Sequence, residues 1–349
     1  MGKILIKNGK IWDGGKFFYG DILAEDKHIV DIAPEISSDA TFTYDAQGLL
    51  VTPGLIDLHT HLKGVSCDKY GIAAESCCFP FGVTAAVDAG AELGDRAYLE
   101  SLNVKNVVLV CTTIRENKAK LDRIPELLQR YGDRAVGLKA YFSTPHATDL
   151  SPLKEIFDYA HSLNLPLMVH CNGAPVPMAE FLELFKAGDI LTHPFHGGKN
   201  NAAEDGYESL RKAQSRGVII DAGFAGHVHT SFEVFRGAVE AGVQPDTIST
   251  DITRSSAFMR GGRYGMTMAL SYARSAGMTE EDILKAVTTT PAKILGKPWG
   301  KLEVGGVADI AVLEYGNEGF YILKQDFESK TGYRCKLTMA DGDVVHREI

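Results

Sequence analysis

The chain has 349 residues, of which 45% are hydrophobic and 23% are charged, and its formal net charge is −9. This length allows about two domains with large cores, and the composition is that of an ordinary globular protein. The acidic balance argues against nucleic acid or an anionic membrane as a partner, since both bind basic surfaces, and no apolar run approaches the roughly 18–20 residues of a membrane span.

The beginning of the chain alternates like a strand over residues 1–10 and shows no apolar signal-peptide core. The six cysteines are scattered and have no CxxC spacing. In a chain of this length that pattern predicts reduced thiols, mostly in the core. We therefore expect a cytoplasmic protein.

Short strands separated by turn signals fill residues 1–52. Lys3–Lys7 has the alternation of a strand, and the pair Asn8-Gly9 that follows it is a hairpin signal. Further strand-like segments, residues 21–24 and 28–32, continue the pattern. The sequence predicts a small β unit here.

From residue 54 onward, apolar strands alternate with amphipathic helices. The predicted strands are Gly54–His61, Val83–Ala89, Asn106–Thr112, Ala135–Tyr141, Leu167–Cys171, Ile190–His193, Val218–Ala222 and Thr247–Asp251. The clearest helices are Leu121–Tyr131, Leu153–Leu163, Met178–Ala187 and Glu204–Arg216, and another begins near Thr279 and ends at Val287. Eight apolar strands separated by helices predict an α/β fold, a (β/α)₈ TIM barrel.

The last segment, residues 300–349, is again rich in strands and punctuated by glycine. It shares this composition with the first segment. We therefore predict a composite β-sandwich domain made of residues 1–52 plus 300–349, and a catalytic barrel domain made of residues 53–299.

Two histidines stand at the end of the first barrel strand. Side chains two residues apart in a strand point to the same face, so His59 and His61 can reach one metal ion together. Residues at the carboxyl ends of the barrel strands converge on one mouth. The later strands end in Lys139, His170, His193 and Asp251, each of which is a metal-ligand type or convertible into one. The sequence therefore predicts a metal centre at this mouth.

With these residues in place, the sequence resembles the amidohydrolase superfamily, in the subtype with a binuclear metal centre. The matching pieces are residues 53–61, 137–139, 169–172, 192–193, 249–251, 291–296 and 305–310. Together they cover nearly the whole chain. They are specific for the superfamily and its metal site, and much less so for the substrate.

The resemblance implies two divalent ions and a Lys139 whose amine is carboxylated by CO₂ to a bridging carbamate. His59, His61, Lys139 and Asp251 would hold the first ion, and Lys139, His170 and His193 the second. These ligands suit Zn²⁺ best, with Mn²⁺, Fe²⁺ or Co²⁺ as alternatives. Two ions about 3.5–4 Å apart can share a hydroxide, and Asp251 would take its proton and pass it to the leaving atom.

The nearest branches that the sequence resembles are dihydroorotase-like and deacetylase-like enzymes. Dihydroorotases carry an arginine two residues beyond the second histidine, where this chain has Lys63. We therefore expect hydrolysis of an acyl, in particular acetyl, amide or ester bond in a small metabolite that bears a carboxylate. The alternatives are a cyclic amide hydrolase, similar to dihydroorotase or hydantoinase, and a catalytically silent scaffold. Silent relatives usually lose metal ligands, whereas all six are present here.

The predicted substrate-binding residues are Tyr141, Asn172, His227 and Arg254. Tyr141 and Asn172 lie beside Lys139 and His170 in the sequence. His227 is preferred over His229 in the loop after the seventh strand, and Arg260 and Arg263 are further candidates for gripping a carboxylate. Relatives are often dimers or larger, so a homo-oligomer is expected, with a small molecule as the substrate.

Overall fold

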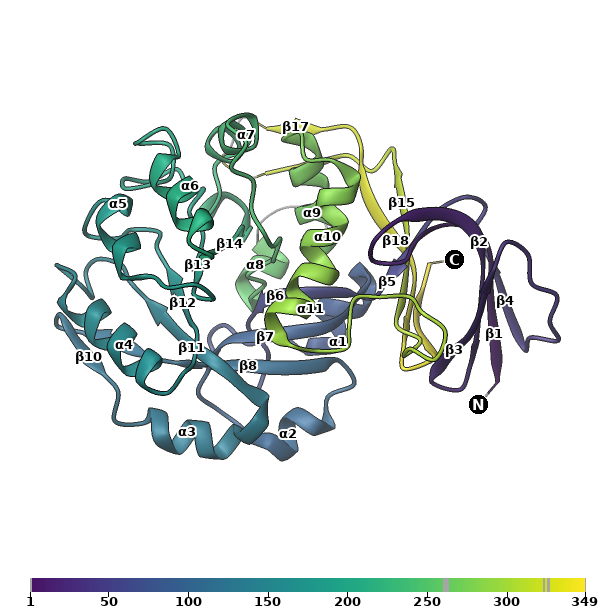
Figure 1. Cartoon of the computed structure of the whole chain (residues 1–349), viewed down its shortest axis with the longest axis horizontal. Coiled ribbons are helices and arrows are strands. Elements are labelled where there is room, and N and C mark those ends of the chain that lie inside the picture. Colours follow the sequence, from purple (N-terminus) through teal and green to yellow (C-terminus); the bar gives the residue numbers. More distant parts are fainter. Residues whose placement is uncertain (1, 260–263, 323, 325–326, 349) are drawn as a thin grey trace.

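The computed structural model describes residues 2–259, 264–322, 324 and 327–348, without the side chains of residues 227, 258 and 259. Its strands form two large sheets, one at each end of the long axis in Figure 1. Both chain termini lie in the smaller, β-rich part, and the rest of the chain forms the larger part.

The β-rich part is one eight-stranded sheet built from both ends of the chain. Its order is β19-β18-β15-β5-β1-β2-β3, with β4 also paired to β1. The strands are β1 (Lys3–Trp12), β2 (Phe17–Glu25), β3 (His28–Ala33), β4 (Phe42–Asp45), β5 (Leu50–Pro53), β15 (Ile310–Gly316), β18 (Gly332–Ala340) and β19 (Asp343–Arg347). The two chain ends join where β15 pairs antiparallel with β5.

This sheet encloses a core of its own. Ile6, Ile11, Val51, Ile310 and Leu337 are among its buried members, so residues from both termini share one apolar interior. The prediction that the two terminal segments build one β-rich unit is confirmed. The domain boundaries at residues 52/53 and 299/300 stay predictions.

The predicted hairpin at Asn8-Gly9 is wrong. These residues lie inside β1, which runs on to Trp12 and pairs with β2 on both sides of them. The register shifts between Ile6 and Gly9, which marks a β-bulge. Asn8 takes a left-handed conformation, φ 56°, and its N–H donates to the Asp21 carboxylate at 2.8 Å. The Asn-Gly pair therefore supplies the positive φ of a bulge instead of that of a turn.

The larger part contains seven parallel strands in the order β14-β13-β12-β11-β8-β7-β6. These are β6 (Leu55–Thr60), β7 (Val83–Ala91), β8 (Lys105–Cys111), β11 (Ala135–Tyr141), β12 (Leu167–His170), β13 (Ile190–Thr192) and β14 (Ile219–Asp221). Each corresponds to a predicted strand, with ends that differ slightly. Because they are parallel, all their carboxyl ends lie on one side.

The predicted eighth strand, Thr247–Asp251, is not a regular strand, but it occupies the eighth position. Isolated parallel bridges join Asp221 to Thr247 on one side and Thr60 to Ile252 on the other. The Asp251 N–H donates to the His59 carbonyl at 2.7 Å. Asp251 has φ 48°, and this left-handed residue interrupts the extended backbone that a ladder requires. The segment nevertheless closes the ring, and the predicted (β/α)₈ barrel is confirmed.

Helices cover the outside of the barrel (Figure 1). They are α1 (Ala74–Cys78), α2 (Arg96–Ser101), α3 (Ile124–Tyr131), α4 (Ser151–Ser162), α5 (Met178–Phe181), α6 (Glu208–Ser215), α7 (Phe232–Glu240), α8 (Arg254–Met259), α9 (Met266–Ser275), α10 (Glu280–Val287) and α11 (Thr289–Leu295). The described residues also include four 3₁₀ turns: η1 (Phe79–Phe81), η2 (Gly132–Arg134), η3 (Leu182–Leu184) and η4 (Gly226–Val228). Two small hairpins pair β9 (Thr113–Arg115) with β10 (Lys118–Lys120), and β16 (Phe320–Tyr321) with β17 (Glu328–Ser329).

Several predicted helix boundaries are wrong for local reasons. The helix expected from Glu204 begins at Glu208, because Tyr207 takes a left-handed conformation, φ 67°. The helix expected over Met178–Ala187 consists of α5 and η3 and stops before Phe185, whose ψ of 140° is extended. The start near Thr279 is confirmed, since its side chain accepts a hydrogen bond from the Asp282 N–H.

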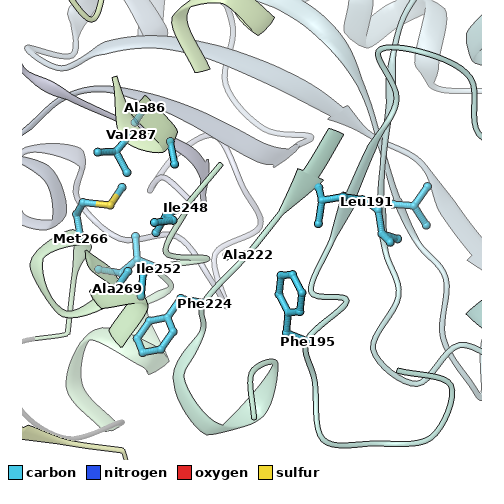
Figure 2. Packing of buried hydrophobic residues seen from close by; sticks show 14 of the residues in the cluster. Ala86, Leu191, Phe195, Ala222, Phe224, Ile248, Ile252, Met266, Ala269 and Val287 are labelled. Carbon is cyan, nitrogen blue, oxygen red and sulfur yellow. The ribbon is translucent and has the colours of Figure 1, made fainter. Parts of the chain in front are cut away.

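Apolar side chains fill the space between the barrel and its helices. Figure 2 shows part of this layer, in which Ile248 of the closing segment and Ile252 just after it lie near Met266 and Ala269 of α9 and Val287 of α10. A separate cluster of strand residues, including Leu58 and Met168, packs with Trp299. In the part of the chain that is described, no helix combines the length and apolarity needed to cross a bilayer.

Candidate metal centre

The six residues predicted as metal ligands come together at the carboxyl ends of the barrel strands. His59, Lys139 and His170 lie within β6, β11 and β12. His61 directly follows β6, and His193 directly follows β13. Asp251 is the last residue of the closing segment, which is bridged to β14 through Thr247. His193 and Asp251 have φ values of 67° and 48°, which non-glycine residues seldom adopt and which are concentrated at functional sites.

His59, His61 and Asp251 form the first group. Each offers one ligand atom, and these atoms lie within 4.8 Å of one another. Asp251 Oδ1 is 3.0 Å from His61 Nε2 and 3.4 Å from His59 Nε2. One carboxylate oxygen thus faces two imidazole nitrogens, an arrangement that one divalent cation could occupy.

His170 and His193 form a second group, together with His229. Their ligand atoms also lie within 4.8 Å of one another. The ring centroids of His170 and His193 are 4.7 Å apart. Asp251 connects the two groups, because its Oδ2 is 4.0 Å from His193 Nε2.

Lys139 is buried, with only 6% of its surface exposed, and its Nζ is 3.2 Å from His59 Nε2. Burial lowers the pKa of Lys139 to about 8, although the carboxylates of Asp251 and Asp221 favour its charged form. Only a neutral amine can attack CO₂, so a lowered pKa favours carboxylation.

Each histidine of the first group contacts a hydroxyl group, and that hydroxyl group in turn contacts a carboxylate. His59 Nδ1 is 3.1 Å from Thr192 Oγ1, which donates to Asp221 at 2.8 Å. His61 Nδ1 is 2.9 Å from Ser66 Oγ, which donates to Asp88 at 3.0 Å. Each hydroxyl gives its hydrogen to a carboxylate and so accepts one from the imidazole. Both Nε2 atoms of the neutral imidazoles then have the lone pair that a ligand requires, and a cation between them and Asp251 Oδ1, which lies 3.0 and 3.4 Å away, would satisfy all three acceptors.

Backbone carbonyls fix the other two histidines. His193 Nδ1 is 2.7 Å from the Gly223 carbonyl, and His170 Nε2 is 3.2 Å from the Asn172 carbonyl. A carbonyl only accepts, so each of these nitrogens carries the hydrogen and the opposite nitrogen has the lone pair. His193 Nε2 is buried, and no described residue hydrogen-bonds to it. A metal ion would satisfy this atom, so the residues present fit a metal centre.

The charges of the site also suit metal binding. Burial lowers the pKa of His59 to about 4 and the pKa values of His170 and His193 well below the usual range. Burial alone would raise the pKa of Asp251, but the nearby His59 and His61 outweigh it and the net shift is downward. The imidazoles of His59, His170 and His193 are therefore neutral and Asp251 is ionised at neutral pH, and these are the forms in which the side chains bind metals.

The backbone of Gly223 contacts the second group, because its carbonyl lies 2.7 Å from His193 Nδ1. A Cβ at this position would lie 2.3 Å from His193 Nδ1 and 2.3 Å from Thr192 Oγ1, and φ is +51°. We expect Gly223→Ala to weaken metal binding by about 10–100-fold, because it displaces a group that orients a ligand. Chelator competition measures this affinity. Gly206→Ala is the matched control, since φ there is +66° and a Cβ meets nothing within 4 Å. Equal affinities in the two variants would contradict the prediction.

The structure shows where some of the predicted substrate-binding residues lie, and the roles of all of them stay predictions. Tyr141 is 45% exposed and its ring lies 4.2 Å from that of His170, so it stands at the rim of the centre. Arg254 is exposed at the start of α8, where its N–H donates to the Tyr70 carbonyl. The side chains of His227 and of Arg260 and Arg263 lie outside the described residues.

His229, which the sequence interpretation placed second to His227, lies against the second group. It approaches His193 at 4.4 Å and His170 at 4.8 Å between ring centroids. Asn172, predicted as a substrate-binding residue, has its side chain 2.8 Å from His229 Nδ1. The His-Val-His spacing offered two candidates, and the left-handed Ala225 that precedes η4 decides how this loop turns. No sequence signal separated the two histidines.

Comparison with known proteins gives a consistent result. A model of the amidohydrolase family matches residues 50–345. A deacetylase of Brucella anthropi is 30% identical, with 77% of this chain and 72% of that protein covered. A dihydroorotase of Streptococcus pneumoniae is 23% identical over 99% of this chain and 100% of its own length. The solved structure of a dihydroorotase superimposes with a TM-score of 0.87, at 24% identity and covering 99% of this chain and 98% of its own, a likeness of fold.

Proposed function

Because this chain belongs to the amidohydrolase family, we propose that it hydrolyses an acyl, in particular acetyl, amide or ester bond of a small metabolite that bears a carboxylate. The observation that carries this proposal is the convergence of His59, His61, Asp251 and Lys139 with the pair His170 and His193. The family acts through divalent metals, and these side chains supply two adjoining groups of ligands.

The proposed centre holds two Zn²⁺ ions and a carboxylated Lys139. His59, His61 and Asp251 would hold the first ion, His170 and His193 the second, and the carbamate of Lys139 would serve both. When bound, the ions supply a hydroxide nucleophile at neutral pH and polarise the scissile carbonyl. Neutral imidazoles and an ionised carboxylate support this assignment.

Asp251 is the proposed general base and acid. Its carboxylate accepts the proton that the attacking hydroxide loses as the new C–O bond forms, and it returns this proton to the leaving nitrogen or oxygen as the scissile bond breaks. Its position supports this role, because its two oxygens face both histidine groups. The lowered pKa of Asp251 keeps it ionised before the reaction.

The proposed acyl substrate rests on the similarity to a deacetylase, and the proposed carboxylate on Arg254. Arg254 is exposed at the start of α8, and its N–H donates to the carbonyl of Tyr70, whose ring contacts that of His61. A second candidate function is cyclic amide hydrolysis, which the similarity to dihydroorotases supports. Lys63 at the position of their arginine argues against it, because lysine cannot grip a carboxylate through two parallel hydrogen bonds.

A substrate panel separates the candidate functions. The metal-loaded enzyme would be assayed against N-acetyl amino acids, O-acetyl hydroxy acids, dihydroorotate and hydantoins. We expect the largest kcat/KM with an acetylated carboxylic acid. A preference for a cyclic amide would establish the second candidate instead, and a metal-free protein inactive on every compound would support the silent scaffold.

A homo-oligomer is also proposed, from the resemblance to family members that assemble. Light scattering coupled to size exclusion measures the mass of the assembly against 37.9 kDa for one chain. A monomer at micromolar concentration would contradict this proposal. The cytoplasmic location stays a prediction.

A further inference from the structure

His229 is the polar residue of the centre for which the proposed ligand set has no role. It follows η4, in the loop after β14, and its side chain is 16% exposed. Its ring lies 4.4 Å from His193 and 4.8 Å from His170, between centroids. Its Nε2 is 3.6 Å from Asp251 Oδ2. His229 could therefore be a third imidazole ligand of the second ion, or it could present a hydrogen to whatever binds there.

Asn172 decides between these roles. Its Nδ2 lies 2.7 Å from the Val228 carbonyl and 2.8 Å from His229 Nδ1. The Val228 carbonyl only accepts, so the side-chain atom that faces it must be the amide nitrogen. The second hydrogen of that nitrogen is directed at His229 Nδ1, which must then accept. Neutral His229 consequently carries its own hydrogen on Nε2, the nitrogen that faces Asp251.

The neighbouring histidines have the opposite arrangement. His193 donates from Nδ1 to the Gly223 carbonyl, and its Nε2 keeps a lone pair for the centre. His170 donates from Nε2 to the Asn172 carbonyl, and its Nδ1 keeps the lone pair. The backbone carbonyl of Asn172 thus leaves the lone pair of His170 on Nδ1, where it can bind a metal. The side chain of Asn172 leaves the hydrogen of His229 on Nε2, where it can be donated. If His229 Nε2 were a ligand, Nδ1–H would meet an Nδ2–H of Asn172 across 2.8 Å.

We propose that His229 is a catalytic residue whose Nε2–H donates a hydrogen bond to the scissile carbonyl oxygen as negative charge develops on it, and that Asn172 is the positioning residue that fixes this tautomer. The inference rests on the proposed hydrolytic function. The donor lies against His170 and His193, on the side of the centre where the carbonyl oxygen would be polarised. A donor held in place before the reaction stabilises developing charge without reorganisation.

His229→Ala tests the proposal by separating metal binding from turnover. We expect the variant to keep two ions per chain and to lose about 10²–10³-fold in kcat, the usual effect of removing one such donor, with little change in KM. His229→Gln should recover part of the loss, because its side-chain amide can donate. Exposed His28→Ala is the control and should match the wild type. Loss of one ion in His229→Ala would overturn the proposal and identify a ligand.

Asn172→Asp provides a second test with a readout that does not depend on activity. Carboxylate oxygens only accept, so His229 would move its hydrogen to Nδ1 and offer Nε2 to the metal. We expect slower extraction of zinc by a chelator than from the wild type, together with lower kcat. Asn172→Ala is the control for the loss of the amide alone, and it should not slow extraction. Unchanged extraction in Asn172→Asp would contradict the assigned tautomer.

Histidine ¹⁵N spectra of the zinc-loaded enzyme show the tautomer directly, with the His229 signals identified by their absence in His229→Ala. A protonated Nε2 and an unprotonated Nδ1 are expected, and a metal-bound Nε2 would overturn the proposal. If the wild type cleaves no compound of the panel, the proposed function has failed, whatever the spectra show. If the wild type is active and His229→Ala is equally active, only this inference has failed.

Discussion

Asp251→Asn is expected to lower kcat by about 10³-fold, in the range of a lost general acid–base catalyst. The amide has nearly the same shape as the carboxylate, but it is not a base and cannot take the proton from the attacking hydroxide. It also removes one anionic ligand from between the two histidine groups, where Asp251 lies 3.0 Å from His61 Nε2 and 4.0 Å from His193 Nε2. Steady-state kinetics with metal analysis of the same sample measures the effect.

Asp246→Asn is the control for this variant. Asp246 lies just before the same closing segment, and its carboxylate accepts from the Ile220 N–H and from Gln214. The amide there should retain near wild-type kcat, because the residue does not contact the metal centre. If Asp251→Asn with full metal content turns over as fast as the wild type, the assignment of Asp251 as the proton carrier is wrong.

Lys139→Ala is expected to reduce metal binding and turnover together. In the proposed centre the carbamate of Lys139 serves both ions, so its loss would remove an anion from each group and should weaken metal affinity by about 10–100-fold or more, the effect of losing even a group that only orients a ligand. Activity should fall by a comparable or larger factor. Short carboxylic acids such as propionate should restore part of both, because their carboxylate can take the place of the carbamate in the cavity that alanine leaves.

Metal analysis after dialysis and kinetics with and without propionate measure these effects. Exposed Lys118→Ala is the control and should respond to neither. A thermal unfolding midpoint close to that of the wild type would show that the variant is folded, which matters because Lys139 is buried. Two ions per chain in Lys139→Ala without any added acid would contradict the bridging role.

The fold was largely predictable because its signals are local and repeated. An apolar strand followed by an amphipathic helix recurs along the middle of the chain, and parallel strands of this kind close into a barrel. Helix ends were less predictable, because they depend on single backbone conformations such as the left-handed Tyr207. The expected hairpin at Asn8-Gly9 failed for a similar reason, because the positive φ of Asn8 can belong to a bulge within one strand as well as to a turn between two strands.

The positions of the six expected ligands were predictable because topology alone brings the carboxyl ends of parallel strands together. His59 and His61 needed only the two-residue period of a strand. Hydrogen bonding was not predictable, since Thr192 and Asp221 reach His59 from other strands. Nothing in their spacing along the chain indicates that one hydroxyl would orient a ligand.

The order of residues was enough to predict the barrel, the β-rich unit that joins both termini and the kinds of side chain at the carboxyl ends of the barrel strands. Those follow from periodicity and residue type, which are properties of neighbours along the chain. The place of His229 beside His170 and His193, and the hydrogen-bond partners that set the tautomers of the histidines in the centre, could be read only from the folded chain. The tautomer of an imidazole depends on the partners of its two ring nitrogens. For His229 the partner of Nδ1 is the side chain of Asn172, 57 residues away in the sequence.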